Sequence, residues 1–311
     1  MQSDQTSAFK ATVVVTTKNR RDGLRTTLLS ATRQVPPVEI VVIDDGSTDG
    51  THEMVRAEFP QVRILRHERS EGLIVRRNEA AQLATTNIVF SLDDDAEFSS
   101  PDVVFQTLRE FDDPRVGAVA IPLVDTYRKA SQGLNLPNAH DTFVDHIFIG
   151  TSHALRVDLF MKLGMYRAFL HHQGEEDDYC IRLLNAGYFV RCGRADPIYH
   201  HVSPARDLHK IARYGARNAI LFAWQNVPTA FLPIHLAGTA VMNARNGLRT
   251  GKLLSTLKGL LIGSRDVLTG PVVRSPVSVR AYRLSRNLRK HGVKSIDECE
   301  RALSTGRNHS A

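Results

Sequence analysis

The chain has 311 residues, enough for one large domain or for one domain with a sizeable appendage. With 42% apolar and 23% charged residues it has the composition of a globular protein. Its three irregularly spaced cysteines, Cys180, Cys192 and Cys299, exclude a disulfide framework or a CxxC zinc site and favour a reducing, cytoplasmic location. The net charge of +7 is uneven: residues 1–205 carry 22 Lys and Arg against 28 Asp and Glu, and residues 206–311 carry 18 against 5.

Strand-like and helix-like segments alternate over the first 120 residues. Continuous apolar, β-branched stretches predict buried strands, and apolar residues at helical spacing predict the helices between them. The expected strands are 11–17, 39–44, 62–67, 87–93 and 116–122, and the expected helices are 21–34, 47–59, 71–84 and 99–111. This alternation predicts an α/β, Rossmann-like fold with a mostly parallel sheet and helices on both faces.

Polar clusters follow three of these strands. They are 16–20 (TTKNR), 44–47 (DDGS) and 93–95 (DDD). In open parallel sheets, ligands bind outside the carboxyl ends of the strands. We therefore expect the three clusters to share one rim of the sheet and to form the functional site.

The regular alternation ends after Pro122. Residues 123–147 lack periodicity, and we expect a long loop that could close over a substrate. The remaining elements expected before residue 206 are a strand at 148–156, a helix at 157–164, a helix at 174–187, and strands at 188–192 and 197–202.

The aspartates at 93–95 suggest a cation site. Carboxylates spaced as in Asp93 and Asp95 can approach one ligand, and oxygen ligands favour Mg²⁺ or Mn²⁺, which commonly bridges to substrate phosphates. A histidine at the end of strand 197–202, His200 or His201, could complete such a site. The alternative is a solvated acidic turn, because a DxD pattern alone is weak.

A second acidic cluster occupies residues 175–178, in the first turn of a predicted helix. Acidic side chains there interact favourably with the helix dipole, but four in a row exceed that need. One of them could act as a general base toward an attacking hydroxyl group. In helix 71–84, Arg76 or Arg77 could hold a phosphate or the acidic rim, or simply form a solvated basic face.

Taken in order, these motifs resemble the family 2 glycosyltransferases, inverting enzymes with the GT-A fold, in a rhamnosyltransferase-like bacterial form. The matching segments are VVVTTKNR, VVIDDGSTDGT, EGLIVRRNEA, SLDDDAEF, GTSHALRVDLFMKLGMY and GEEDDYCIRLLNAGY, which together span about residues 10–205. Departures from the family pattern are Thr16 for a proline, Lys18 for an aromatic residue, Arg76 for a small residue and Ala80 for a glycine.

The resemblance implies roles on the donor side of the reaction. Thr17 and Asp45 would contact the nucleobase, Asp44 would support the loop, and Asp93 would lie near the ribose. Asp95, assisted by Asp93 and by one of His200 and His201, would bind a Mg²⁺ or Mn²⁺ ion that bridges the diphosphate. The other residues expected at the donor site are Asn19, Arg20, Gly72, Arg77, Asn78 and Asp94. Of the three aspartates, Asp94 is expected to matter least.

The resemblance also implies the reaction. A hydroxyl group of a glycan or lipid-linked saccharide would attack the anomeric carbon of a nucleotide-diphospho-sugar in one inverting displacement. Glu176 aligns with the general base of the family, where an aspartate is usual, and Asp177 is the rival if the alignment shifts by one residue.

We expect two domains, a GT-A catalytic domain at 1–205 and a basic, mostly helical extension at 206–311. The extension carries an R-Y-x-x-R-N segment, at 213–218, similar to one that follows the catalytic domain in related transferases. Its apolar stretch 227–242 is shorter than the ~20 residues needed to span a bilayer. It either packs on the core or lies on an anionic membrane at the cytoplasmic face.

Other functions fit the sequence less well. A sugar nucleotidyltransferase needs a Gly-rich loop after the first strand, but TTKNRRDG has one glycine. A non-catalytic sugar- or lipid-binding protein on a decayed transferase fold would not need the intact acidic clusters. Nucleic-acid binding by the basic extension lacks interleaved aromatic residues and any module signature, so we expect no nucleic-acid partner.

Overall fold

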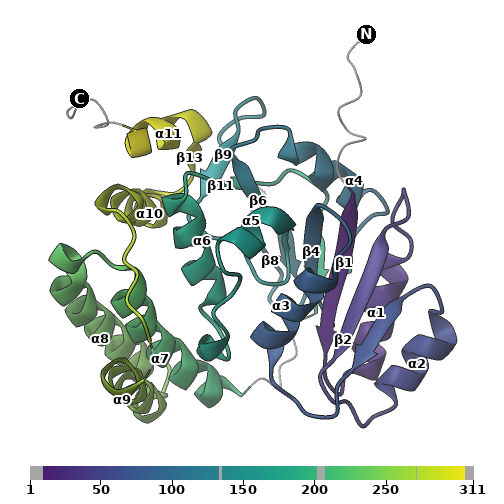
Figure 1. Ribbon diagram of the computed structural model, residues 1–311, viewed down its shortest axis with the longest axis horizontal. Helices are drawn as coiled ribbons and strands as arrows, with labels where there is room; N and C mark the ends of the chain where they lie inside the picture. The colour runs from purple at the N-terminus through teal and green to yellow at the C-terminus, as the bar shows by residue number, and fades with distance from the viewer. Residues whose placement is uncertain (1–9, 133–134, 202–206, 271, 305–311) are drawn as a thin grey trace.

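The computed structural model describes residues 10–132, 135–201, 207–270 and 272–304, and within them the main sheet has nine strands in the order β13-β9-β11-β6-β10-β4-β1-β2-β3. Helices cover this sheet, and further helices form a group at one side of it (Figure 1). The strands are β1 (Ala11–Thr17), β2 (Glu39–Asp44), β3 (Arg63–Arg66), β4 (Ile88–Asp93), β6 (Val116–Ala120), β9 (Phe143–Asp145), β10 (His153–Arg156), β11 (Phe189–Cys192) and β13 (Lys294–Ser295).

The expected α/β fold is confirmed, and the sheet is mixed. Strands β3, β2, β1 and β4 are parallel neighbours, whereas β10 runs antiparallel between β4 and β6. In the register of the parallel part, Thr17 pairs with Asp44 and Thr16 pairs with Asp93. The carboxyl ends of β1, β2 and β4 therefore meet at one edge, as the three polar clusters require.

A second, four-stranded sheet lies within the described residues in the order β5 (Ala96–Phe98), β12 (Ile198–His200), β7 (Leu123–Asp125) and β8 (Ala130–Gln132). Antiparallel pairing places His200 opposite Ala96, the residue after Asp95. The prediction of a long loop at 123–147 was wrong, because β7, β8 and β9 lie in it. Three-residue strands are too short to show a period of two.

The helices of the first two thirds lie between the strands largely as predicted. They are α1 (Arg21–Ala31), α2 (Thr51–Glu58), α3 (Leu73–Leu83), α4 (Val103–Leu108), α5 (Val157–Lys162) and α6 (Glu175–Asn185). Helix α4 begins at Val103, four residues into the expected helix 99–111, because residues 101–102 form a turn.

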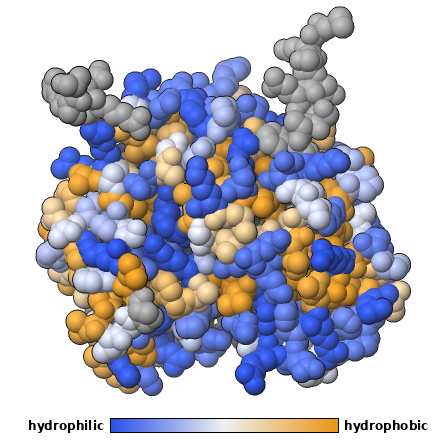
Figure 2. Space-filling view, viewed as in Figure 1, coloured by the Kyte–Doolittle hydropathy of each residue, from blue (hydrophilic) through white to orange (hydrophobic). Residues whose placement is uncertain are grey.

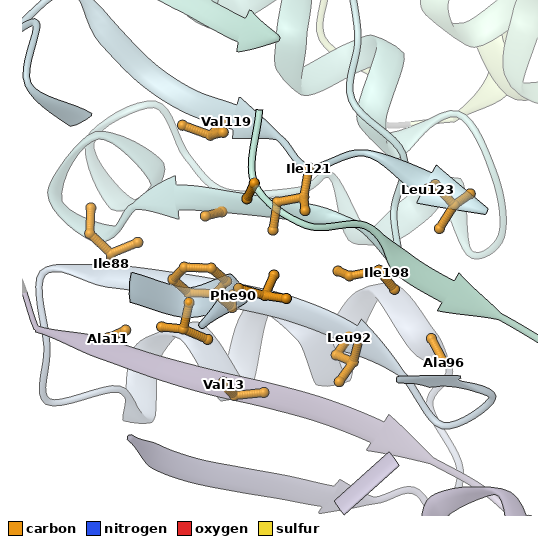
Figure 3. Close-up of a cluster of buried hydrophobic side chains, with 14 of the residues drawn as sticks. Ala11, Val13, Ile88, Phe90, Leu92, Ala96, Val119, Ile121, Leu123 and Ile198 are labelled. Atoms are coloured by element: carbon orange, nitrogen blue, oxygen red, sulfur yellow. The ribbon is translucent and has the colours of Figure 1, made fainter. Parts of the chain in front are cut away.

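The core lies between the sheets and the helices. Its side chains come from both sheets and point toward one another, with Phe90 and Leu92 of β4, Ile121 after β6 and Ile198 of β12 near its centre (Figure 3). Strand β1 is buried along its whole length, which explains its unbroken apolar and β-branched sequence. This rigid layer fixes where the strand ends point.

The C-terminal part is mainly helical, as expected. Its helices are α7 (Leu208–Asn226), α8 (Leu232–Arg249), α9 (Leu253–Thr269), α10 (Val279–His291) and α11 (Ile296–Ser304). Strand β13 pairs with β9, so the end of the chain adds to the main sheet. The expected domain boundary at 205/206 lies outside the described residues and stays a prediction. Among the described helices, none is both long and apolar enough to cross a bilayer.

Candidate active site

A cleft of about 740 Å³ opens where β1, β2 and β4 end, and we call it the rim cleft. One wall consists of the polar strand ends, including Thr17, Asp45 and residues 93–95. A second wall consists of the loop 172–174 and the start of α6. The first turn of α7 closes one side with Asp207, Lys210 and Ile211. Segments from three distant parts of the sequence therefore form one site.

Asp93, Asp95 and His200 form a cluster in the rim cleft, and their ligand atoms all lie within 4.8 Å of one another. The Nε2 atom of His200 is 3.2 Å from the Oδ1 atom of Asp95. Two carboxylates and one imidazole are a donor set that suits Mn²⁺ and that accommodates Mg²⁺. The cluster forms because the pairing of β5 with β12 brings His200 beside the end of β4.

His201 takes a different direction. Its ring nitrogens lie 3.0 Å from Thr126 Oγ1 and 2.9 Å from Glu97 Oε1. Strand alternation sends neighbouring side chains to opposite faces, so only one of the two histidines can face the aspartates. Of the two histidines left open by the sequence, the structure brings His200 to the cluster.

Arginines donate hydrogen bonds to both carboxylates of this cluster. Arg77 is buried and donates to Asp93 at 2.6 Å and to Glu175 at 3.2 Å. Burial would lower the pKa of Arg77, but the charges of Asp93 and Glu175 raise it above its usual value. Arg20 donates to Asp95 at 2.8 Å. Arg77 thus connects the strand wall to the first residue of α6.

Asp94 is more enclosed than the sequence suggested. Its side chain is 14% exposed and accepts a hydrogen bond from Thr17 Oγ1 at 2.8 Å. Burial raises the pKa of Asp94 to about 7, against the opposing charge of Arg20. The backbone carbonyl of Asp94 lies so close to Gly23 that a methyl group there would come within 2.6 Å of it. The expectation that Asp94 matters least stays untested.

Asp45 lines the cleft but is already saturated with hydrogen bonds. Its two oxygens accept from Ser70 Oγ at 2.6 Å, Glu71 N at 2.9 Å, Gly72 N at 2.9 Å and Arg76 Nε at 2.7 Å. Burial opposes ionisation, but these hydrogen bonds lower the pKa of Asp45 overall. Arg76, which departs from the family pattern, is therefore the buried counter-ion of Asp45.

Other expected donor-site residues lie beside the rim cleft and support its loops. Asp44 accepts from the backbone of Ser47 at 2.8 Å, in line with its expected supporting role. The amide of Asn19 accepts from the backbone N–H of Thr48 at 2.7 Å, which joins the loops after β1 and β2. Asn78 exchanges two hydrogen bonds with the backbone of Tyr166.

Glu176 faces the cleft from the first turn of α6 and is partly buried. Burial and the charge of Glu175 raise its pKa to about 8, although Arg77 acts in the opposite direction. Its Oε1 atom lies so close to Gly150 that a methyl group there would overlap it. A carboxyl group with such a pKa can accept a proton near neutral pH.

Asp177 points away from the cleft and pairs with Arg289 of α10. The frame of the helix explains the difference, because successive residues of a helix point about 100° apart. Of the two bases proposed from sequence, Glu176 is the one that lines the rim cleft.

Sequence analysis missed several parts of the site. His172, Gln173 and Lys210 line the cleft, and none of them belongs to a motif that sequence analysis connected with the site. Gly150 lies in a matching segment but was given no role there. The R-Y-x-x-R-N segment was the one available signal, since its last residue, Asn218, hydrogen-bonds the loop that contains His172 and Gln173. The sequence alone did not show that Asn218 contacts this loop, because only the fold brings α7 against it.

Comparison with known sequences agrees with this architecture. Residues 12–165 match the family described as Glycosyl transferase family 2. The chain is 27% identical over 274 residues to the pre-mycofactocin glycosyltransferase of Mycobacterium tuberculosis, covering 82% of this chain and 56% of that protein. It is 25% identical over 292 residues to the succinoglycan biosynthesis protein ExoU of Rhizobium meliloti, covering 89% and 75%. The chain thus spans little more than half the length of the mycobacterial relative.

Comparison with solved structures shows the same fold. The mannosyltransferase PcManGT from Pyrobaculum calidifontis, in complex with GDP-Man and Mn²⁺, matches with a TM-score of 0.58 at 22% identity, over 85% of this chain and 88% of that one. TarS of S. aureus, residues 1–349 in complex with UDP-GlcNAc, matches with a TM-score of 0.59 at 17% identity, over 94% and 90%.

Proposed function

The chain belongs to glycosyltransferase family 2, and we propose that it transfers a sugar from a nucleotide-diphospho-sugar to a hydroxyl group of an acceptor. One observation carries this proposal: the Asp93, Asp95 and His200 cluster and the Glu176 carboxyl group line the same cleft. The first set suits a cation on a diphosphate, and the second suits a general base. Between them is room for a donor sugar and an attacking hydroxyl group.

On the donor side, Asp93, Asp95 and His200 would hold Mg²⁺ or Mn²⁺. When bound, such an ion supplies positive charge next to the leaving diphosphate. The chain adds its own cations, since Lys18, Arg20 and Lys210 line the same cleft. Their charges favour binding of an anionic donor and stabilise the charge that develops on the leaving group. The PcManGT complex with GDP-Man and Mn²⁺ supports this assignment.

The nucleobase would lie at the Asp45 end of the cleft, beside Thr17 and Lys18. Because all four hydrogen-bonding positions of the Asp45 carboxylate are already used, its main contribution is to fix Arg76 and the 70–72 loop. Thr17, which donates a hydrogen bond to Asp94, lines the cleft together with Asp45. The roles of Asn19, Asp44 and Gly72 are to hold these loops in place, and Asn78 holds the backbone of Tyr166.

On the acceptor side, Glu176 takes the proton from the attacking hydroxyl group as the new glycosidic bond forms. The nucleoside diphosphate leaves from the opposite face of the anomeric carbon, so the configuration inverts. The presence of Glu176 and the Asp93, Asp95 and His200 cluster in one cleft supports this arrangement. Asp177, paired with Arg289, takes no direct part.

The acceptor would be a glycan or a lipid-linked saccharide, and the transferred group a hexosyl or deoxyhexosyl unit. The likeness to ExoU, named for succinoglycan biosynthesis, supports a role in the synthesis of a cell-envelope polysaccharide. With a lipid-linked acceptor the protein would work at the cytoplasmic face of a membrane as a peripheral protein.

The test is a screen of nucleotide-sugars. The full chain is heated with each of a panel of UDP-, GDP- and dTDP-sugars, with and without Mn²⁺ or Mg²⁺, and the melting temperature is recorded. We expect one donor to stabilise the protein only with the metal, and the same donor to release its nucleoside diphosphate slowly by hydrolysis. In Asp95→Ala both effects should be lost, and in the control Asp102→Ala, on the exposed start of α4, both should persist.

Two outcomes would contradict the proposal. One is stabilisation by no donor in the panel with either metal. The other is nucleotide release that is equal in the wild type, Asp95→Ala and Glu176→Gln, because neither the cation cluster nor the base would then matter.

A further inference from the structure

Helix α9 is packed with its glycines inward and its leucines outward. Its buried residues are Thr256, Gly259 and Gly263. A methyl group on Gly263 would come within 2.6 Å of the Arg217 carbonyl oxygen, so α7 and α9 touch along their backbones. The leucines at 254, 261 and 268 are 84%, 72% and 83% exposed, and Leu257 is 44% exposed.

Helix α8 likewise buries a glycine and exposes its large apolar residues. Gly247 is its one buried residue, whereas Ile234, Val241, Met242 and Leu248 are 65–74% exposed. These four positions recur at one face of a helix. A short turn, 250–252, joins α8 to α9, and the two helices pack on each other. We call residues 232–269 the α8–α9 hairpin.

This outward arrangement of large apolar residues differs from the arrangement in helix α10. Helix α10 lies in the same C-terminal part and is also basic, but it buries Tyr282, Leu284 and Leu288 and exposes its arginines. In Figure 2, apolar side chains gather at the lower left of the molecule, where Figure 1 draws α8 and α9. Such a contiguous apolar surface marks an interaction site.

The charges of the hairpin indicate the partner. Residues 232–269 contain five basic residues, Arg245, Arg249, Lys252, Lys258 and Arg265, and a single acidic one, Asp266. Asp266 is already paired with Arg217 of α7. An apolar face carrying only unneutralised positive charge complements a surface that is apolar inside and anionic outside, which describes an anionic lipid bilayer.

The hairpin also adjoins the rim cleft. Ser255, in the first turn of α9, lies 3.0 Å from the Nδ1 atom of His209. The next residues of α7, Lys210 and Ile211, line the cleft. A bilayer on the hairpin would therefore lie beside the opening through which an acceptor enters.

We propose that the exposed leucine face of the α8–α9 hairpin docks on anionic lipid and so brings a lipid-linked acceptor to the rim cleft. The docking stands on the geometry of the hairpin, and its purpose rests on the proposed function. Helix α10, which has a similar basic composition, does not take part, because its apolar face is already covered.

The test is co-sedimentation of the full chain with vesicles of phosphatidylcholine alone and of phosphatidylcholine mixed with phosphatidylglycerol. We expect binding to the mixed vesicles that weakens as salt is added. The affinity of the triple variant Leu254→Gln, Leu261→Gln, Leu268→Gln for these vesicles should be lower by about tenfold or more. The matched control Leu29→Gln, on the exposed side of α1, should bind like the wild type. Circular dichroism and melting temperature confirm that each variant is folded.

Equal binding by the wild type and the triple variant would overturn the proposal. A second result would also overturn it. If the wild type bound neither type of vesicle and were a dimer by light scattering, while the triple variant were a monomer, the leucine face would be covered by a second copy of the chain. The assay needs no sugar donor, so its result is independent of whether the proposed transferase activity is found.

A second feature involves α7 and the loop before α6. Three of the four residues His171–Gly174 have left-handed backbone angles, with φ of 59° at His171, 69° at Gln173 and 84° at Gly174. This conformation is strained for the two non-glycine residues and persists only when the surroundings enforce it. Glu176 follows two residues later, so the loop fixes where the base points.

Asn218 supplies that enforcement. It is 2% exposed, and its side-chain amide donates to the carbonyl oxygens of Leu170 at 2.9 Å, His172 at 2.9 Å and Gln173 at 2.6 Å. Its own oxygen accepts from Arg217 at 2.8 Å, which fixes the direction of the amide. The amide nitrogen has two hydrogens, so one of them is shared between two of these three carbonyl groups, and one buried side chain binds the strained loop at three points.

The structure assigns Asn218 as the positioning residue for Glu176. It acts through the loop and touches neither donor nor acceptor, since it does not line the rim cleft. The assignment rests on the proposed function insofar as Glu176 is the base. It predicts that loss of the amide changes turnover and leaves donor binding intact.

The test uses Asn218→Leu, which keeps the volume and removes the donors, and Asn218→Ala. The control is Asn243→Leu, because that amide bonds only to Thr239 of its own helix. We expect faster hydrogen exchange of amides 170–176 in both Asn218 variants and a kcat about tenfold lower with KM for the donor within about twofold.

Unchanged exchange in the loop would overturn the assignment, as would a raised KM with unchanged kcat. If the wild type turned over no donor at all, the proposed function would fail, while the exchange experiment would still decide whether Asn218 holds the loop. A melting curve for each variant separates a local change from global unfolding.

Discussion

The carboxyl groups that line the rim cleft lie in different environments. On the strand wall, Asp45, Asp93 and Asp95 each accept a hydrogen bond from an arginine. On the helix wall, Glu176 has no such hydrogen bond to an arginine in the described structure, and burial with the neighbouring charge of Glu175 raises its pKa to about 8. Glu176 therefore holds its proton more tightly than an ordinary glutamate, and burial does the same to Asp94 on the strand wall. An arginine pairs with each of the other three carboxylates of the strand wall.

This difference separates two chemical tasks that use the same functional group. Carboxylates that bind a cation must be charged, whereas a general base works best when its pKa is near the working pH. Divergent environments for neighbouring carboxyl groups are a recurring sign of such a division. Arg77 lies at the junction, since it bonds both Asp93 and Glu175.

The largest effect is expected on the helix wall. Glu176→Gln keeps the shape but cannot accept a proton, so kcat should fall by about 10²–10⁴-fold with KM for the donor little changed. Asp177→Asn, at the neighbouring position, should change kcat by less than about threefold because Asp177 faces Arg289. Steady-state nucleotide release measures both. The reverse ranking would move the base to Asp177.

On the strand wall, Asp95→Ala should lower turnover by about 100-fold or more and abolish the stabilisation by Mn²⁺ with donor. Asp95 is one of the three clustered side chains that would hold the ion, and its loss leaves Arg20 without that partner. Calorimetric titration with Mn²⁺ in the presence of donor gives a reading independent of turnover. Mn²⁺ affinity equal to that of the wild type would remove Asp95 from the metal site.

The pH dependence of activity and of stability should follow the protonation of Glu176. Because the carboxylate is the active form of Glu176, kcat/KM should fall about tenfold for each pH unit below its pKa of about 8. Stability should change in the opposite direction. The folded state holds this proton more tightly than an unfolded glutamate, so unfolding free energy decreases as pH rises from the unfolded pKa of 4.5 toward 8. Glu176→Gln should remove the pH dependence of kcat/KM in this range and reduce the slope of the unfolding free energy, to which the raised pKa of Asp94 also contributes. Nucleotide release and chemical denaturation at several pH values measure the two effects.

Gly150→Ala should produce a moderate effect by disturbing the junction of the two walls. The added methyl group would overlap Glu176 Oε1 and come within 2.8 Å of the Arg77 guanidinium. Both side chains must shift, and we expect about a tenfold loss of kcat with about 1–3 kcal/mol of lost stability. Melting and kinetics together check this. Full activity would show that the base tolerates displacement.

Arg289→Ala should have the smallest effect. It removes the ion pair with Asp177, which is partly exposed and outside the cleft. Such a pair contributes about 0–1 kcal/mol to stability, and kcat should stay within about twofold of the wild type. A large loss of activity would mean that α10 helps to aim the start of α6.

Much of the strand wall was determined by the sequence alone. Buried parallel strands have continuous apolar sequences, and their carboxyl ends share one edge, so Asp45, Asp93 and Asp95 could be brought together from their order. The acidic start of α6 was also visible as a motif. These inferences needed only local pattern and the connection rule of α/β sheets.

The tertiary structure decided the choices that depend on direction. The pairing of β12 with β5 brings His200, and not His201, to the cluster, and the rotation of α6 places Glu176, and not Asp177, at the rim cleft. The contacts of Asn218 with the loop before α6 join residues about 45 apart and follow no sequence rule.

The α8–α9 hairpin shows the limit most clearly. In α9, leucines and small residues alternate around the helix, so its sequence offers two apolar faces. Hydrophobicity predicts that the leucines are buried, but close backbone approach to α7 requires Gly259 and Gly263 at the contact, and the leucines are left outside. Sequence determines which faces a helix has, and the shape of its neighbour decides which of them is buried.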